Sequence, residues 1–389
     1  MHGKINVLMA AVEPSADEIA AQVYGELKKL FAGQAAFIGC GGERMRSEGF
    51  HSAFPVAPFS VMGATDVLRV APLAVKRAHQ LADLVVTNKV HIAIFVDGWA
   101  FSRLAARQIR KRSPQTRIYK LAAPQIWASR SGRVKFVKKN FDGVLALLPF
   151  EPDLFRRYGV RSEFIGNPNF QLAWNNRGSM ATFRKRHNLG DREILAVFLG
   201  SRRSELRNLA RAFREAAISV SERRPELQII TVPASTIAND VKIEVSSWPG
   251  NPIIVSPEDK YDAFAAADVA LAASGTISTE LAINQTPTII AYKVDPLTAI
   301  WARIVVKTPY ASIINVLADE FIIPEFIQEK CQADLIAEKV LAFLDDERLR
   351  TRQVTHMQHE LGKLEIDGPP AALRAAKIII NWAKEDGAI

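Results

Sequence analysis

The chain has 389 residues, which is too long for one ordinary hydrophobic core, so two domains are expected. Hydrophobic residues make up 48% of it, and no apolar run approaches the roughly 18 residues of a membrane span, so the composition argues against a disordered or membrane-spanning protein. The net charge of +9 is uneven: residues 1–170 hold 24 Lys and Arg against 13 Asp and Glu, and residues 103–139 hold 12 basic residues and no acidic one. This asymmetry predicts a polyanionic partner for the first half, namely a nucleic acid, a phosphorylated substrate or an anionic membrane.

The first half alternates apolar strands with amphipathic helices. It opens with a predicted strand at 5–11 and not with a signal peptide, because no small-residue cleavage site follows. Further strands are predicted at 35–38, 91–96, 117–121 and 143–148, and helices at 17–31, 70–87, 101–112 and 150–157. Such alternation predicts a parallel sheet covered by helices on both faces.

The segment 166–179 is rich in Asn, Gly and Pro and is expected to connect the two domains. A second α/β series follows, with strands predicted at 193–199, 227–232, 252–255, 268–272 and 287–291, and helices at 203–222, 258–266, 276–284 and 296–306. The C-terminus is predicted to be helical at 333–345, 347–361 and 370–386. We therefore expect an α/β protein with two Rossmann-like, doubly wound parallel-sheet domains that face a cleft, with ligands at the carboxyl ends of the strands.

Two carboxylates follow predicted strands of the first domain. Glu13 comes after the first strand, and Asp97 comes directly after the strand at 91–96, followed by Gly98 and Trp99. Each carboxylate has two open interpretations: it acts as a base, or it only accepts N–H bonds from its loop. Trp99 either stacks on a sugar or acyl chain or fills the volume of the loop.

Two polar turns follow predicted strands of the second domain. In the first, Gly200 permits a sharp turn and Arg202 is able to clamp a phosphate, although a solvated arginine remains the alternative. In the second, Ser274, Gly275 and Thr276 lead into a helix whose N–H groups and dipole favour an anion. Glu280, one turn further on, is able to accept the hydroxyls of a ribose. The alternative is a helix capped by Ser274 with an exposed Glu280.

Metal sites are not expected. Cys40 and Cys331 stand alone, so both are predicted to be reduced thiols, and the seven histidines form none of the spacings that bind zinc.

Several segments together carry a resemblance to one family. They are Gly200-Ser201-Arg202 with Ser204-Glu205, the Ser274–Thr276 turn with Glu280, and the segments 125–130 (QIWASR), 144–151 (VLALLPFE), 308–315 (TPYASIIN) and 323–328 (IPEFIQ). In this order, and over nearly the whole chain, they resemble lipid-A-disaccharide synthase. The resemblance implies a metal-independent, cofactor-free GT-B glycosyltransferase that inverts the anomeric carbon.

The resemblance also implies substrates and site residues. The donor is a UDP-linked, acylated glucosamine-type sugar, and the acceptor is a lipid such as 2,3-diacylglucosamine 1-phosphate. It divides the chain into an acceptor and membrane domain at 1–168, a donor domain at 169–366 and a C-terminal helix at 367–389 that crosses back to the first domain, in a possible homodimer. The residues expected to bind the UDP-sugar are Gly200, Ser201, Arg202, Ser274, Gly275, Thr276, Glu280, Asn315, Glu325 and Gln328.

The acceptor side is expected to lie on the cytoplasmic face of the inner membrane, as a peripheral contact. The segment 59–77 matches the family's membrane-contacting region and is interpreted either as an interfacial helix or as an ordinary core-facing helix. The residues assigned to the acceptor or the membrane are Ser15, Asp17, Trp99, Val67, Leu68, Arg69 and Leu73, with Val70, Val75, Lys76 and Arg77 nearby.

The acceptor half departs from the family pattern. Ala100 stands where that pattern has the aspartate proposed as general base, and Asn167 stands where it has a histidine. Asp97 and Glu13 are therefore the remaining candidates for the base. Three functions stay open: an active UDP-sugar transferase, a UDP-sugar-binding protein with another acceptor or no activity, and a nucleic-acid-binding protein. The last is disfavoured because the chain has no RRM, KH or helix-turn-helix signature.

Overall fold

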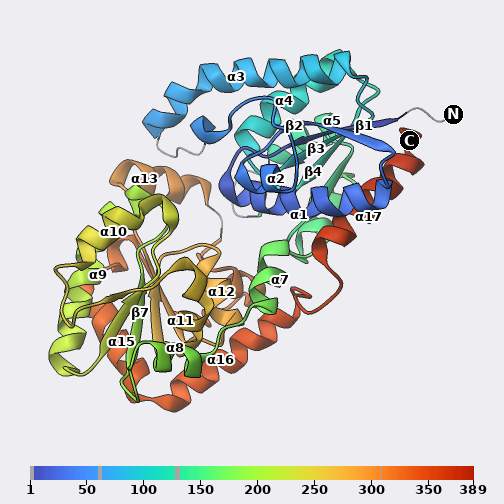
Figure 1. The fold of residues 1–389 in the computed structure, drawn as a ribbon. Coiled ribbons are helices and arrows are strands. Elements are labelled where there is room, and N and C mark those ends of the chain that lie inside the picture. The colour runs from blue at the N-terminus through green and yellow to red at the C-terminus, as the bar shows by residue number, and fades with distance from the viewer. Residues whose placement is uncertain (1–3, 60–63, 128–131, 307) are drawn as a thin grey trace. The chain divides into compact units, whose positions relative to one another are not determined.

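The computed structural model describes residues 4–59, 64–127, 132–306 and 308–389, with side chains for all of these except 64–69, 297, 300, 301, 304 and 305. The chain divides into two compact units (Figure 1). The first comprises Met1–Gln171 together with Asp367–Ile389, and the second comprises Leu172–Ile366. Each unit is an α/β structure around its own parallel sheet, as predicted.

The first unit contains a six-stranded sheet with the order β2-β1-β3-β4-β5-β6. Its strands are β1 (Ile5–Ala10), β2 (Ala35–Cys40), β3 (Ile92–Val96), β4 (Arg117–Leu121), β5 (Gly143–Ala146) and β6 (Ser162–Phe164). Its helices are α1 (Pro14–Phe31), α2 (Glu43–Ser47), α3 (Ala64–Thr87), α4 (Trp99–Arg112), α5 (Arg133–Asn140), α6 (Glu151–Arg156) and α17 (Ala371–Glu385). The central strand β3 is apolar and buried along its whole length, as expected of a strand covered on both faces, whereas β4 contains Arg117 and Lys120 and β6 contains Ser162 and Glu163.

The second unit contains another six-stranded parallel sheet, with the order β12-β11-β10-β7-β8-β9. Its strands are β7 (Ile194–Phe198), β8 (Gln228–Thr231), β9 (Ile253–Ile254), β10 (Val269–Ala272), β11 (Thr288–Tyr292) and β12 (Glu325–Ile327). Its helices are α8 (Met180–Arg186), α9 (Arg203–Arg223), α10 (Ala238–Val245), α11 (Lys260–Ala266), α12 (Ile277–Ile283), α13 (Pro296–Val305), α14 (Ile313–Ala318), α15 (Ala333–Asp345) and α16 (Glu347–Gly362).

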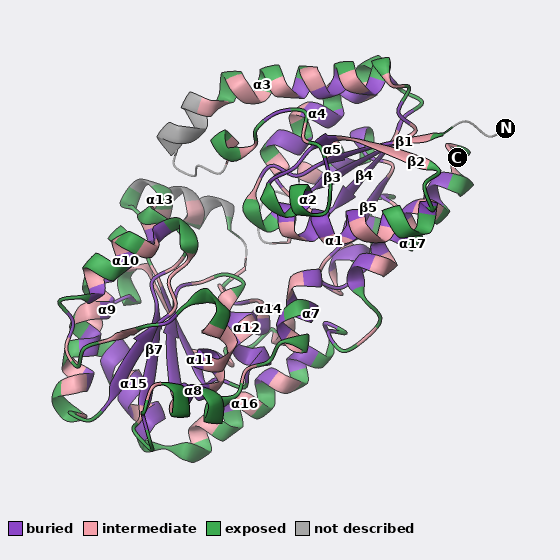
Figure 2. Ribbon diagram, viewed as in Figure 1, coloured by how far each residue is buried: buried purple, intermediate pink, exposed green. Residues whose placement is uncertain are grey.

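Each sheet separates two hydrophobic clusters (Figure 2). In the first unit, α1 and α17 cover one face and α3, α4 and α5 cover the other. In the second, α9 and α15 cover one face, and α8 and α11 the other. The last helix belongs to the first unit because Trp382 packs on Tyr119 and fills the space that a side chain at Gly143 would need, 2.3 Å from its Cβ position.

Each sheet also has a switch point, where successive connections leave in opposite directions. In the first sheet it lies between β1 and β3, and in the second between β7 and β10. Loops diverge there at the carboxyl ends of the strands, which is where open α/β sheets bind ligands. The segment expected to connect the domains is partly helical: α7 (Pro168–Asn175) contains the boundary between the units, and the Asn167 side chain accepts the Asn169 N–H at its start.

Candidate active site

The turn after β7 is held by a buried carboxylate. Glu205 accepts the Ser201 N–H at 2.8 Å, pairs with the Arg202 guanidinium at 3.0 Å and accepts the Tyr292 hydroxyl at 3.3 Å. Gly200 has a φ of 89°, and a Cβ there would lie 2.4 Å from Glu205 Oε2, so only glycine fits. Arg202, although paired with Glu205, remains 46% exposed on its side chain.

The turn after β10 is held by a hydroxyl. Ser274 donates to the Ala311 carbonyl at 2.9 Å, so it does not cap α12; Thr276 occupies the N-cap position without a side-chain bond. Gly275 has a φ of 133° and open space around its Cβ position. The turns predicted around Arg202 and Ser274 therefore follow the two strands that flank the switch point of this sheet.

Two further predicted residues, Glu325 and Asn315, support the turn after β10. Glu325 accepts the backbone N–H groups of Ala311 and Ser312, each at 2.8 Å, and burial raises the pKa of its carboxyl group. Asn315 is fully buried, and its amide bonds Glu325 and the backbone of Ile323 at 2.8 Å. Asn315 therefore supports Glu325 and the turn, and its expected contact with the UDP-sugar stays a prediction; Gln328 begins a short helix at a φ of 54°.

Glu280 has a partner that the sequence patterns did not indicate. The Lys260 ammonium lies 2.7 and 2.8 Å from its two carboxylate oxygens, and the same nitrogen lies 5.2 Å from the ring centroid of Tyr261 and 5.5 Å from that of Phe264. Glu280 is therefore not the solvated residue of the alternative interpretation. A Lys at the start of a short helix, followed by aromatic residues, was the only signal for this pair.

In the first unit, Asp97 ends β3 in a strained conformation, with a φ of 42°. Its N–H donates to the Leu121 carbonyl at 2.9 Å, and its own carbonyl accepts bonds from Lys120 Nζ and Ser102 Oγ, each at 2.6 Å. In the described part of the chain, every hydrogen bond of Asp97 is made by its backbone. The loop is therefore held by the peptide, and the carboxylate is left for other contacts.

Two further charged groups lie near Asp97. Lys120 is 1% exposed; burial lowers its pKa to about 8, while the negative charges of Asp97 and Glu13 oppose that shift. Glu151 accepts the Trp127 indole N–H and the Leu148 N–H, and burial raises its pKa to about 7, with Asp97 adding to the rise. The loops after β1 and β3 also meet, because a Cβ on Gly98 would lie 3.7 Å from Glu13 Oε1.

Asp17 and Ser15 have surroundings that differ from those of Asp97. The Asp17 carboxylate is buried and accepts the N–H groups of Gly42, Arg44 and Met45, so it holds the start of α2, and its expected role at the acceptor stays a prediction. Ser15 is exposed in the first turn of α1.

Comparison with known proteins defines the family. Residues 7–372 match the family model described as lipid-A-disaccharide synthetase. The lipid-A-disaccharide synthase of Paramagnetospirillum magneticum is 36% identical over 383 residues, covering 97% of this chain and 98% of its own. The chain belongs to the lipid-A-disaccharide synthase family. It is accordingly a glycosyltransferase of lipid A biosynthesis, as its motifs predicted.

Solved structures share the fold of this synthase family member. A MnaA–UDP structure from S. aureus aligns with a TM-score of 0.65 at 12% identity, over 97% of this chain and 95% of that one. MurG from Acinetobacter baumannii aligns with a TM-score of 0.55 at 12% identity, over 97% and 99%. These likenesses confirm the predicted GT-B arrangement of two Rossmann-like sheets.

Trp99 and Ala100 begin α4 in this family member. Trp99 is half-buried: its ring packs edge-on against Phe136 at 5.7 Å, and the Arg133 guanidinium lies 5.8 Å from its centroid. These contacts favour the space-filling interpretation of Trp99. Ala100 is exposed and carries no group that could take a proton.

The segment assigned to the membrane lies mostly in α3. Its second half packs into the core through Ala78, Leu81, Ala82 and Val85. In its first half Leu73 is half-buried and Val75 is 44% exposed, while the side chains of Val67, Leu68 and Arg69 lie outside the described residues. No helix in the described ranges is long and apolar enough to cross a membrane, and no three His, Cys, Asp or Glu residues among them are grouped to hold a metal ion.

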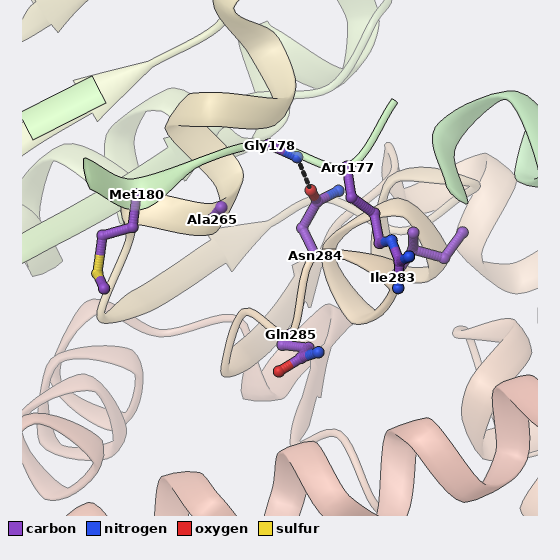
Figure 3. Close-up of a pocket in the computed structure, with 7 residues that line it drawn as sticks. All are labelled: Arg177, Gly178, Met180, Ala265, Ile283, Asn284 and Gln285. Atoms are coloured by element: carbon purple, nitrogen blue, oxygen red, sulfur yellow. Dashed lines mark hydrogen bonds between the residues drawn. The ribbon is translucent and has the colours of Figure 1, made fainter. Parts of the chain in front are cut away.

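A hollow of about 450 Å³ lies elsewhere in the second unit (Figure 3). Its lining comes from the segment before α8, the first residue of α8, α11 and the C-terminal end of α12, where Asn284 accepts the Gly178 N–H. It is lined by Arg177, Gly178, Met180, Ala265, Ile283, Asn284 and Gln285. None of these is a predicted site residue, and this hollow is not the candidate active site.

Proposed function

We propose that this protein transfers an acylated glucosamine-type sugar from UDP to a lipid acceptor such as 2,3-diacylglucosamine 1-phosphate, with inversion at the anomeric carbon and without a metal. Family membership supports the reaction class. The observation that carries the finer proposal is the pair of turns at the switch point of the second sheet, which contain a half-exposed arginine and three hydroxyl-bearing residues, Ser201, Ser274 and Thr276. The S. aureus relative in fold is a structure with UDP, which favours the same ligand.

The second unit is assigned to the donor. Arg202, with Ser201 beside it, and the Ser274–Thr276 turn would stabilise the departing diphosphate, a role that Mg²⁺ has in other transferases. Glu280 would accept the ribose hydroxyls while Lys260 holds it in place. Gly200, Asn315, Glu325 and Gln328 would shape these turns.

The first unit is assigned to the acceptor. Asp97 would take the proton from the attacking hydroxyl, since its carboxylate is not used to hold the loop. Glu13 is the second candidate because its loop adjoins that of Asp97. The basic character of residues 1–170 and the first half of α3 support contact with a phosphorylated lipid and an anionic, cytoplasmic membrane face. A homodimer is part of the same proposal.

The test is UDP release from UDP-2,3-diacylglucosamine in detergent, with and without 2,3-diacylglucosamine 1-phosphate. Acceptor-dependent release is expected, and Asp97→Asn should reduce kcat by about 10²- to 10⁴-fold. Asp83→Asn, which removes an exposed carboxylate of the same unit that pairs with Arg112, serves as the control and should leave the rate unchanged. UDP release that does not depend on the acceptor would refute this assignment. UDP release that is unchanged in both Asp97→Asn and Glu13→Gln would refute it as well.

A second candidate is a UDP-sugar-binding protein that acts on another acceptor or on none. Ala100 favours it, because an exposed alanine occupies the first turn of α4 beside Asp97. This candidate predicts UDP binding that Arg202→Ala weakens, together with no acceptor-dependent release in the same assay.

A further inference from the structure

One buried cation in the first unit has no place in the assignments above. Lys120 lies on β4 between Tyr119 and Leu121, at a position that the interior of a parallel sheet normally gives to an apolar residue. Burying an ammonium is costly unless it is fully bonded. Its surroundings should therefore show what the cation is for.

Among the residues that the structure describes, the Lys120 ammonium is bonded only to backbone carbonyls. Its Nζ lies 2.6 Å from the Asp97 oxygen, 3.1 Å from the Leu121 oxygen and 3.4 Å from the Phe95 oxygen. Three carbonyls match the three N–H groups of an ammonium, whereas a neutral amine would turn its lone pair toward one of them. The site thus favours the charged form, and burial opposes it.

The shortest of these bonds reaches the strained peptide. Asp97 has a φ of 42°, which a non-glycine residue adopts only when its surroundings impose it. Lys120 Nζ and Ser102 Oγ hold the same carbonyl from two elements, β4 and α4. They therefore determine where the Asp97 side chain points.

The charge of Lys120 also acts on its neighbours. The acidic groups that interact with it are Asp97, at the end of β3, and Glu13, after β1. Glu151, at the start of α6, adds a further acidic group that interacts with Asp97. A nearby charge of opposite sign favours the charged forms of both partners.

We infer that Lys120 is a positioning residue for sugar transfer: its ammonium holds the Asp97 peptide in the left-handed conformation and places a positive charge beside the acidic groups of Asp97 and Glu13. This inference rests on the proposed function for its catalytic meaning. Its electrostatic part concerns the free protein alone.

The first experiment follows the Asp97 carboxyl carbon by NMR in ¹³C-aspartate-labelled protein, with Asp97→Asn to assign the signal. Lys120→Met keeps the length of the side chain and removes the charge, so the Asp97 midpoint should rise by about 1 pH unit. Arg117→Met is the matched control: it removes a cation from the same strand, paired with Asp142 and in register with Ile92 at the opposite end of β3. It should leave the midpoint unchanged. An unchanged midpoint in Lys120→Met overturns the inference.

The wild-type protein supplies a test that does not depend on the variant folding. The pKa of Lys120 is lowered to about 8, so the Asp97 signal should show a second inflection near that pH as the neighbouring charge is lost. A single inflection would contradict the inference.

The pH dependence of kcat/KM then separates this inference from the proposed function. In Lys120→Met, the acidic limb of the kcat/KM profile should move to a higher pH by about 1 pH unit, and the KM for the UDP-sugar should stay unchanged. Ser102→Ala removes the other donor to the same carbonyl without changing charge, so it should lower kcat and leave the limb in place. A shifted NMR midpoint in Lys120→Met, with no sugar transfer by the wild type, would support the inference and refute the proposed function. Sugar transfer by the wild type, with no shift of the NMR midpoint or of the acid limb in Lys120→Met, would support the proposed function and refute the inference.

Discussion

The two units place opposite charges at turns that flank the switch points of their parallel sheets. After β7, the buried carboxylate of Glu205 bonds the Ser201 N–H and pairs with the Arg202 guanidinium, whose side chain stays 46% exposed. After β3, a buried ammonium, Lys120, bonds backbone carbonyls and leaves the Asp97 carboxylate without a loop bond in the described residues. A diphosphate needs a cation and an attacking hydroxyl needs a base, so each unit buries the charge of the opposite sign to the one its substrate would meet.

Breaking the support in the second unit should have the largest effect on stability. Glu205→Ala removes the bonds to Ser201, Arg202 and Tyr292, and leaves an N–H group without its partner. The free energy of unfolding should fall by about 4 kcal/mol, measured by urea denaturation. Glu215→Ala, on the same helix but in an exposed pair with Arg211, should change it by no more than about 0.5 kcal/mol. Equal effects would show that Glu205 does not hold the turn.

The buried Glu151 of the first unit should make the free energy of unfolding depend on pH. Burial raises the pKa of Glu151 from 4.5 to about 7, so the folded state binds this proton more tightly than the unfolded state. Stability should therefore decline as the pH rises from about 4.5 to 7, by on the order of 3 kcal/mol, and Glu151→Gln should lack this decline. Urea midpoints measured from pH 5 to 8 provide the check, and parallel curves for both proteins would contradict it.

Arg202 should contribute more to UDP binding than the adjacent Arg203 does. Arg202→Ala should weaken UDP binding by about 10- to 100-fold in calorimetry, because a charge-assisted bond to phosphate is lost. Arg203→Ala removes the adjacent arginine, which is 80% exposed and paired with Asp240, and should leave binding unchanged. Similar losses in both variants would point to general charge attraction and not to a positioned contact.

The smallest effect is expected at a glycine. Gly275 has a φ of 133° and free space around its Cβ position, so Gly275→Ala should cost about 1 kcal/mol from backbone strain alone. Gly362 also has free space but lies at the end of helix α16, where alanine should stabilise by about 0.5–1 kcal/mol. Opposite signs in urea denaturation would confirm that conformation, and not crowding, selects glycine at 275.

The motifs of the second unit could be predicted because they are local. Gly200–Arg202 and Ser274–Thr276 each combine a strand end, a turn and a helix start within a few residues, so the chemistry is visible in the sequence. The supports were not visible. Lys260 lies 20 residues from Glu280, and Glu325 is 14 residues from the Ala311 N–H that it bonds. Only folding brings these groups together.

Asp17 shows the limit of motif reasoning in the first unit. It shares its stretch with Glu13 and Ser15, but its carboxylate is turned inward to the start of α2, 25 residues away. Lys120 shows the reverse: nothing in the pattern around it indicates a site, yet it holds the Asp97 turn.

The sequence by itself determined the two parallel-sheet units, the family and the turns that end their strands, because strand and helix periods and turn chemistry are properties of short segments. The tertiary structure alone decided which charges are buried. It also decided which carboxylates accept backbone N–H groups and which are left to contact a substrate. The reason is physical: the ionisation of Lys120 and Glu151 depends on burial and on neighbours from other strands, and both exist only once the sheet has formed.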